Sequence, residues 1–223
     1  MTTLTGPERP AASGTADSIV VFLHGYGADG ADLIGLADPL APHLPDTRFF
    51  APNAPERSGA NPMGYQWFPI PWLDGTPEAE ARAAAARSYA LLDRWLDALP
   101  EATGIGPERT VLVGFSQGTM MALHVGLRRT AALAGIVGFS GRLLDPEALA
   151  GEIATRPPVL LIHGDADPVV PFESLGLAET ALTAAGVETR THVSRGVGHG
   201  IAPDGLTLAL RFIQARLPGF RER

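Results

Sequence analysis

The chain has 223 residues and a hydrophobic content of 45%, which suits one domain with a single core and leaves no room for a second catalytic domain. Its formal net charge of −7 argues against a surface that binds the phosphates of nucleic acid. The chain contains no cysteine, so disulfides, cysteine-ligated zinc and thiol nucleophiles are excluded together.

The first residues of the chain are polar and contain several glycines and prolines, and they lack the apolar stretch of a signal peptide. We predict a flexible leader over residues 1–17 and one domain over residues 18–223. No apolar run approaches the roughly 18 residues that would span a bilayer. We therefore expect no integral membrane association and a cytoplasmic location.

Short apolar runs typical of buried parallel strands recur along the chain, and helical patterns lie between most of them. One helix is expected to begin with Thr76 as its N-cap, followed by Pro77 and Glu78 in its first turn. This alternation predicts a single-domain α/β fold, a mostly parallel sheet with helices on both faces and ligands at the carboxyl ends of its strands. Strands are expected at 19–23, 48–51, 111–114, 133–139, 159–163 and 189–193, and helices at 76–99, after 116, at 172–185 and at 203–217.

A long segment over residues 53–75 departs from this pattern, because it is rich in proline and aromatic residues. We expect it to lack regular structure. Loops of this length are usually functional or disordered, and the aromatic content favours a function. The segment is either a surface loop held to the core by its aromatic side chains or an apolar wall over a bound acyl group. In the second case the substrate-binding residues are Tyr65, Trp67, Phe68 and Trp72.

The pentapeptide at residues 114–118 reads Gly-Phe-Ser-Gln-Gly and lies between an expected strand and an expected helix. This order is typical of a nucleophile elbow, in which a serine occupies a strained turn with its hydroxyl exposed. The flanking glycines are needed because side chains there would collide with neighbouring backbone. The pattern predicts Ser116 as the nucleophile of a hydrolase.

A serine nucleophile needs a histidine as general base, and in hydrolases of this fold the acid and then the histidine follow the serine. His199 lies in a glycine-rich loop between a strand and the last helix, where it can reach the carboxyl edge of the sheet. We predict that His199 is the base. His124 and His192 are expected to be structural, and His163 is expected to organise the turn that follows it.

Two carboxylates, Asp165 and Asp167, follow the strand expected at 159–163. Either could orient His199, and the residues alone favour Asp167 only modestly, because Asp165 could equally cap the turn. A metal site built on the pair lacks a supporting set of histidines and acids, so no metal is expected.

The negative charge that develops on the substrate carbonyl requires two backbone N–H donors. We expect one from Gln117, the residue after the nucleophile, and the other from Tyr26 in the loop after the first strand. The same loop offers a rival interpretation, since residues 25–30 match the G-x-G-x-x-G pattern of nicotinamide-dependent oxidoreductases. The absence of an acid after the second strand and the presence of Asp29 both argue against it. A second near match at residues 138–142 lacks the closing glycine and indicates a strand end beside the site.

These motifs together resemble the phospholipase/carboxylesterase family of α/β-hydrolases, which includes acyl-protein thioesterases. The resemblance extends from about residue 20 to 217 and implies Ser116, Asp167 and His199 as the triad and Tyr26 and Gln117 as oxyanion donors. It favours Asp167 over Asp165. The segment at residues 63–68 is more similar to bacterial esterases than to the eukaryotic thioesterases. Family resemblance also implies a homodimer.

We therefore expect a serine esterase that uses no cofactor and hydrolyses carboxylic esters of short to medium acyl chain through an acyl-enzyme on Ser116. Its partner is a small-molecule or lipid ester. An acyl-protein thioesterase or a lysophospholipase shares the same machinery, because both reactions pass through the same oxyanion. A non-catalytic binding protein on a hydrolase fold is a third possibility.

Overall fold

The computed structural model describes residues 3–218 of the chain, and a seven-stranded sheet forms its centre. The strands follow the order β1-β3-β2-β6-β7-β8-β9, with β1 antiparallel to β3 and every other neighbouring pair parallel. This confirms the fold class predicted from the alternation of strands and helices. The strands are β1 (Glu8–Arg9), β2 (Ser18–Leu23), β3 (Thr47–Phe50), β6 (Thr110–Phe115), β7 (Gly135–Phe139), β8 (Val159–Gly164) and β9 (Thr189–Ser194).

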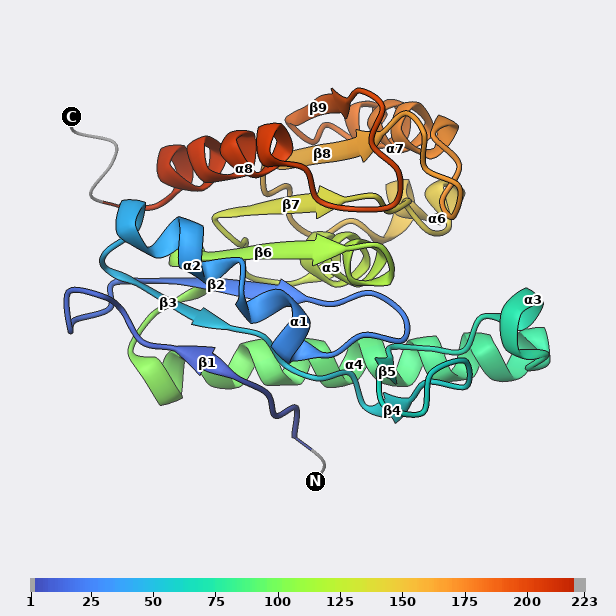
Figure 1. Cartoon of the computed structure of the whole chain (residues 1–223), viewed down its shortest axis with the longest axis horizontal. Helices are drawn as coiled ribbons and strands as arrows, with labels where there is room; N and C mark the ends of the chain where they lie inside the picture. The colour runs from blue at the N-terminus through green and yellow to red at the C-terminus, as the bar shows by residue number, and fades with distance from the viewer. Residues whose placement is uncertain (1–2, 219–223) are drawn as a thin grey trace.

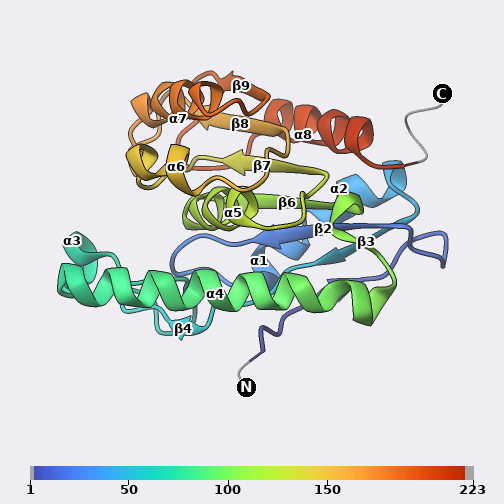
Figure 2. The same cartoon turned by 180° about the vertical axis from the view of Figure 1, so that it is seen from behind.

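Helices cover both faces of the sheet, as Figures 1 and 2 show from opposite sides. Successive side chains of a strand point to opposite faces, so β2 contributes Val20 to one core cluster and Val21 to the other. Within the described residues, no helix combines the length and the apolar character that a membrane crossing requires. One face carries α1 (Gly30–Ile34), α2 (Ala37–Leu40) and α8 (Pro203–Arg216), and the other carries α4 (Glu78–Thr103), α5 (Gln117–Arg128), α6 (Pro146–Glu152) and α7 (Glu173–Ala184). Short 3₁₀ turns lie at Ala41–His43 and Pro107–Arg109.

The parallel strands point toward one end of the molecule, where α3 (Pro71–Asp74) also lies (Figure 1). Their carboxyl ends therefore share one edge, and the loops that leave this edge bring distant parts of the sequence together.

The start of α4 differs from the prediction. The helix begins at Glu78 after Pro77, without a side-chain cap, and it continues to Thr103. Thr76 lies outside the helix, and its backbone N–H donates to Asp74 Oδ1 at 3.0 Å. The short helices α1, α2 and α6 were not predicted, since each is only one to two turns long and carries little periodic pattern.

Part of the segment expected as a flexible leader, residues 1–17, packs on the domain. Its β1 pairs with the outer edge of β3, so that Glu8 lies opposite Phe50. Leu4 is buried in the core cluster, and Pro7 O accepts a hydrogen bond of 3.0 Å from Ala51 N. Residues 1 and 2 lie outside the described part of the chain.

The segment over residues 53–75 also contains more regular structure than expected. It forms a small two-stranded sheet from β4 (Glu56–Arg57) and β5 (Tyr65–Gln66), followed by α3. Tyr65 bridges to Ala28, which fastens this hairpin to the loop after β2. The segment is therefore held beside the carboxyl edge of the sheet.

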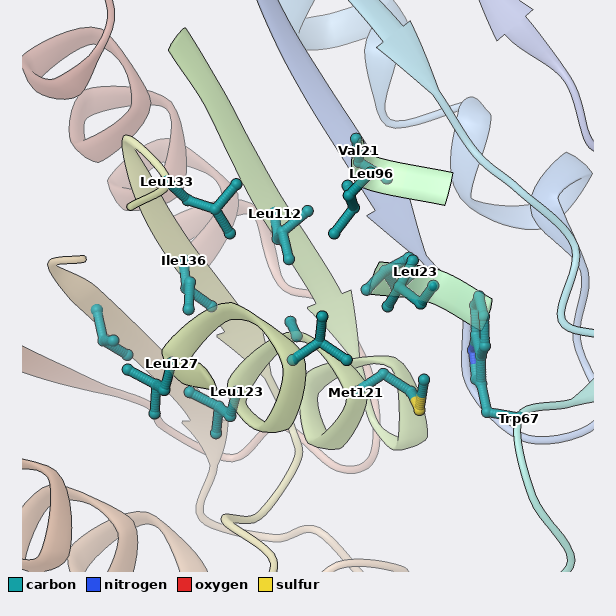
Figure 3. Close-up of a cluster of buried hydrophobic side chains, with 14 of the residues drawn as sticks. Val21, Leu23, Trp67, Leu96, Leu112, Met121, Leu123, Leu127, Leu133 and Ile136 are labelled. Carbon is teal, nitrogen blue, oxygen red and sulfur yellow. The ribbon is translucent and has the colours of Figure 1, made fainter. Parts of the chain in front are cut away.

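Trp67 is the largest fully buried side chain of the described residues. Figure 3 shows it at one end of the cluster that fills the α5 face of the sheet, with Leu23 and Met121 among its members. Its backbone carbonyl accepts a hydrogen bond from Ser88 Oγ on α4. One residue of the aromatic segment thus completes the hydrophobic core.

We expect Trp67→Ala to lower the free energy of unfolding by about 3–5 kcal/mol, because it leaves a cavity in the core. Trp72 is 75% exposed, so the matched control Trp72→Ala should cost less than about 1 kcal/mol. Chemical denaturation of both variants measures the difference. Equal losses would show that Trp67 is not part of the core.

Candidate active site

Ser116 occupies a sharp turn between β6 and α5, as expected of a nucleophile elbow. Its φ is 53° and its ψ is −116°, a conformation that a residue with a side chain adopts only under constraint. A Cβ on Gly118 would lie 1.8 Å from Leu23 O, and a Cβ on Gly114 would lie 2.4 Å from Gly118 O. The two glycines therefore allow α5 to approach β2 and β6 closely.

Asp167 and His199 meet at the same edge of the sheet, from the loops after β8 and β9. His199 Nδ1 lies 2.8 Å from Asp167 Oδ2, and the Asp167 side chain is fully buried. The other carboxylate oxygen accepts hydrogen bonds from the backbone N–H groups of Val169 and Val170, at 2.8 and 2.9 Å. A carboxylate held in this way fixes the tautomer of His199 with its proton on Nδ1.

The pKa of Asp167 is lowered despite its burial. Burial alone would raise the pKa of this carboxyl, but the hydrogen bonds from His199, Val170 and Val169 stabilise the charged form more strongly. Asp167 is therefore ionised at neutral pH. It can stabilise an imidazolium on His199 without itself taking the proton.

Asp165 has a different place from Asp167. Its Oδ1 accepts a 2.6 Å hydrogen bond from Gly196 N, which belongs to the loop that carries His199. Ala166 N donates to Val197 O of the same loop at 3.1 Å. Asp165 thus fastens the acid loop to the histidine loop, and Asp167 alone of the two contacts the imidazole.

His199 lies beside the elbow. Its ring centroid is 4.9 Å from that of Phe115, the residue before Ser116. Because Asp167 occupies Nδ1, the ring nitrogen left for a proton transfer is Nε2. The structure therefore brings the predicted nucleophile, base and acid to one end of the sheet.

The two expected oxyanion donors flank Ser116. Gln117 is the first residue of α5, so its N–H has no acceptor within the helix. Tyr26 follows Gly25, and a Cβ on Gly25 would lie 3.3 Å from the Cβ of Ser116. The loop that carries Tyr26 N–H thus packs directly on the elbow.

His24 fixes this loop, a role that the sequence analysis did not assign. Its Nδ1–H donates to Gly25 O at 2.8 Å, and its Nε2 accepts from Ala54 N at 2.9 Å. Burial lowers the pKa of His24, which keeps the ring neutral and suits one donating and one accepting nitrogen. Trp67 Nε1–H donates to His24 O at 3.0 Å. The signal available in the sequence was the position of His24 directly before Gly25.

The Gln117 side chain joins the elbow to the aromatic segment. Its Oε1 accepts from Trp67 N at 2.9 Å, and its Nε2 donates to Phe68 O at 2.8 Å. The carbonyl oxygen and the amino group of this side chain both bond the aromatic segment, and the side chain is buried, so it does not face substrate. Gln117 offers only its backbone N–H to a reacting carbonyl.

A groove of about 450 Å³ opens between the aromatic segment, α4 and the loop after β7, and Ser116, Asp167 and His199 are not among the residues that line it. Its volume falls within the range of roughly 300–1,000 Å³ that is typical of ligand pockets. Phe68 and Trp72, two of the four residues predicted to bind substrate, line it. The lining residues are Phe68, Pro69, Ile70, Pro71, Trp72, Glu78, Ala81, Arg82, Ala85, Tyr89, Arg142, Leu144 and Asp145.

Two of the four predicted substrate-binding residues do not line this groove. Trp67 is fully buried, so its predicted contact with an acyl group is corrected to a contact with the core. Tyr65 lies in β5, with Arg57 stacked 4.2 Å from its ring centroid. The aromatic content of a loop does not show which rings face inward. Tyr89 and Arg142 of the groove were missed, because they belong to other parts of the chain.

Three other histidines, His163, His192 and His124, make defined contacts, and the buried Nδ1 of His124 has no hydrogen-bond partner among the described residues. His163 Nε2 lies 3.0 Å from Val170 O and organises the acid loop, as expected. His192 Nε2 lies 2.7 Å from Asp204 Oδ2. His124 stacks on Tyr89 at 3.6 Å, and burial lowers the pKa of His124 to about 4. His124 therefore binds a proton too weakly to act as a general base at neutral pH.

The glycines of the rival dinucleotide motif serve the packing of this fold. Gly27 has a φ of +76°, which favours glycine, and a Cβ on Gly30 would lie 1.9 Å from Ala51 O. Asp29 caps the short helix α1 by accepting from Asp32 N. Ser140 of the second near match is buried, and its Oγ donates to Gly200 O at 3.4 Å.

An elbow after the central strand β6 and an acid–histidine pair on the following loops define an α/β-hydrolase. The chain belongs to the phospholipase/carboxylesterase family, whose sequence pattern it matches over residues 9–217. The resemblance found in the sequence is confirmed. The protein is therefore a hydrolase of a family with esterase and thioesterase members.

Individual relatives carry both kinds of name. Acyl-protein thioesterase 1 of Gibberella zeae is 31% identical and aligns over 94% of each chain. Esterase YpfH of Escherichia coli is 27% identical over 95% of this chain and 86% of that protein. The solved structure of esterase PE8 is 49% identical, with a TM-score of 0.91, and covers 97% of this chain and 100% of that one.

We expect Asp167→Asn to lower kcat for ester hydrolysis by about 10³–10⁴-fold, because the neutral amide no longer holds His199 in its reactive tautomer. The control is Asp165→Asn, which keeps an oxygen for Gly196 N and should retain kcat within about fivefold. Steady-state kinetics on one activated ester measures both. The reverse order of effects would assign the acid to Asp165.

Proposed function

We propose that the protein is a serine carboxylesterase that forms an acyl-enzyme on Ser116. The observation that carries the proposal is the strained Ser116 set beside a His199–Asp167 pair at the carboxyl edge of the sheet. Strain of this kind concentrates at functional sites, and it serves here to present the hydroxyl to a substrate and to the base.

The reaction follows from these positions. His199 Nε2 takes the proton of Ser116 Oγ as the oxygen attacks the ester carbonyl carbon. The carbonyl oxygen becomes an oxyanion, which the N–H groups of Gln117 and Tyr26 stabilise. The bond to the alcohol oxygen then breaks, and the imidazolium returns its proton to the departing alcohol. Water repeats the sequence on the acyl-enzyme and releases the carboxylic acid.

We place the substrate in the groove that Phe68 and Trp72 line. Two lining residues contact the elbow, since Phe68 O accepts a hydrogen bond from Gln117 Nε2 and Arg142 follows Gly141, which packs on Ser116, and most of the lining residues are apolar. This supports esters with a short to medium acyl chain. A thioesterase activity is the second candidate, because the relative from Gibberella zeae is named acyl-protein thioesterase 1. The triad serves either leaving group.

Ser116→Ala should lower kcat by about 10⁴–10⁶-fold and leave the unfolding midpoint within a few degrees, because only one buried hydroxyl is removed. A fluorophosphonate reagent should label Ser116 in the wild-type protein, as shown by peptide mass spectrometry. Wild-type activity in the alanine variant would refute the assignment. Failure to label a folded protein would instead favour a non-catalytic binding protein.

A substrate panel tests the class of ester. We expect kcat/KM to rise from acetyl toward medium chains and then fall, and Trp72→Ala to reduce the gain for longer chains, because an apolar wall is lost. Matched oxygen esters, thioesters and lysophospholipids compared at one chain length separate the candidate activities. An unchanged profile in Trp72→Ala would remove this residue from the acyl site.

A further inference from the structure

Arg142 is placed at the border between the groove and the elbow. It follows Gly141, where a Cβ would lie 2.9 Å from Ser116 O, so the chain before Arg142 packs on the nucleophile turn. Arg142 lines the groove together with Phe68 and Trp72, and its side chain also borders a smaller hollow next to α7. The catalytic steps proposed above make no use of this residue.

The charge of Arg142, which is partly buried, lacks the carboxylate partners that two other arginines of similar or greater burial have. Arg129 is paired with Asp93 and Asp97, and Arg128 is paired with Glu152. Among the described residues, no carboxylate oxygen lies within hydrogen-bonding or ion-pair distance of the Arg142 guanidinium. Its Nε is buried and has no hydrogen-bond partner.

The remaining contacts of Arg142 leave its donors available. Its guanidinium carbon lies 5.5 Å from the ring centroid of Trp72, a cation–π contact that uses the face of the guanidinium. The other charged residues of the groove are Glu78, Arg82 and Asp145, and all three are exposed. Arg142 is therefore the least solvated charge of the groove, and its N–H groups suit a carboxylate or a phosphate.

We infer that Arg142 selects ester substrates that carry an anionic oxygen group, a carboxylate or a phosphate, on the part of the molecule that lies in the groove. The inference rests on the proposed esterase function. Phe68, Trp72 and Tyr89 would contact the apolar chain, and Arg142 would bind the charge through paired N–H donors. The chain as a whole is acidic, so an arginine without a carboxylate partner gives an anionic substrate a local attraction in the groove.

Two matched substrate pairs test this inference. In the first, the 4-nitrophenyl monoester of suberic acid is compared with its methyl ester, so that the acyl chain ends in a carboxylate or in a neutral group. In the second, a lysophosphatidic acid is compared with the monoacylglycerol of the same acyl chain. The quantity measured is the ratio of kcat/KM for the anionic and the neutral member of each pair.

We expect Arg142→Gln to lower this ratio by about 10–100-fold in at least one pair, because a charge-assisted hydrogen bond is lost. Arg142→Lys should restore part of it, since the charge remains and the planar pair of donors does not. Arg211→Gln is the matched control, an exposed arginine of α8 that does not line the groove, and should change the ratio by less than about threefold.

The outcomes separate the inference from the function on which it rests. A loss in the suberate pair places the anion on the acyl side, and a loss in the lysophosphatidic acid pair places it on the alcohol side. An unchanged ratio in both pairs overturns the inference, as does an equal loss in Arg211→Gln, which would show a general effect of net charge. If the wild-type protein hydrolyses none of the four esters, the proposed function fails instead.

Discussion

The close approach of α5 to β2 is the constraint on which the rest of the site depends. Gly118 lies so near Leu23 O that no larger residue fits, and the chain reaches this contact through the sharp turn at Ser116. The same contact places the loop after β2 beside the elbow. One steric condition thus determines where the serine and both expected oxyanion donors lie.

A buried network of hydrogen bonds fixes the positions of the two expected oxyanion donors, Gln117 N–H and Tyr26 N–H. The Gln117 side chain bonds the backbone of Trp67 and Phe68, the Trp67 indole bonds His24 O, and His24 bonds Gly25 O. The network runs from the elbow through the aromatic segment to the loop of Tyr26. The aromatic segment therefore has two roles. Trp67 packs in the core and bonds the loop after β2, whereas Phe68 and Trp72 form one wall of the groove.

The sequence was informative where a residue's role depends on its place along a strand or loop. Apolar runs and the order serine, acid, histidine predict the sheet and bring Ser116, Asp167 and His199 to one edge. Asp165 and Asp167 lie two residues apart and differ in their hydrogen-bond partners, Gly196 N for Asp165 and His199 for Asp167. Sequence spacing does not distinguish these partners. The burial of Trp67 and the groove position of Arg142 could not be predicted from the sequence, because both depend on segments that meet only in the folded chain.

The antiparallel strand β1 has a consequence for the edges of the sheet. It covers the outer side of β3, so the sheet presents its longer unpaired edge at β9, on the opposite side of the molecule. An exposed strand edge is a template for pairing with a second chain, and charged side chains on it oppose such pairing. Arg190 of β9 is exposed and forms an ion pair with Glu188. The short strand β1 at one edge and the charged pair at β9 on the other thus both oppose strand addition.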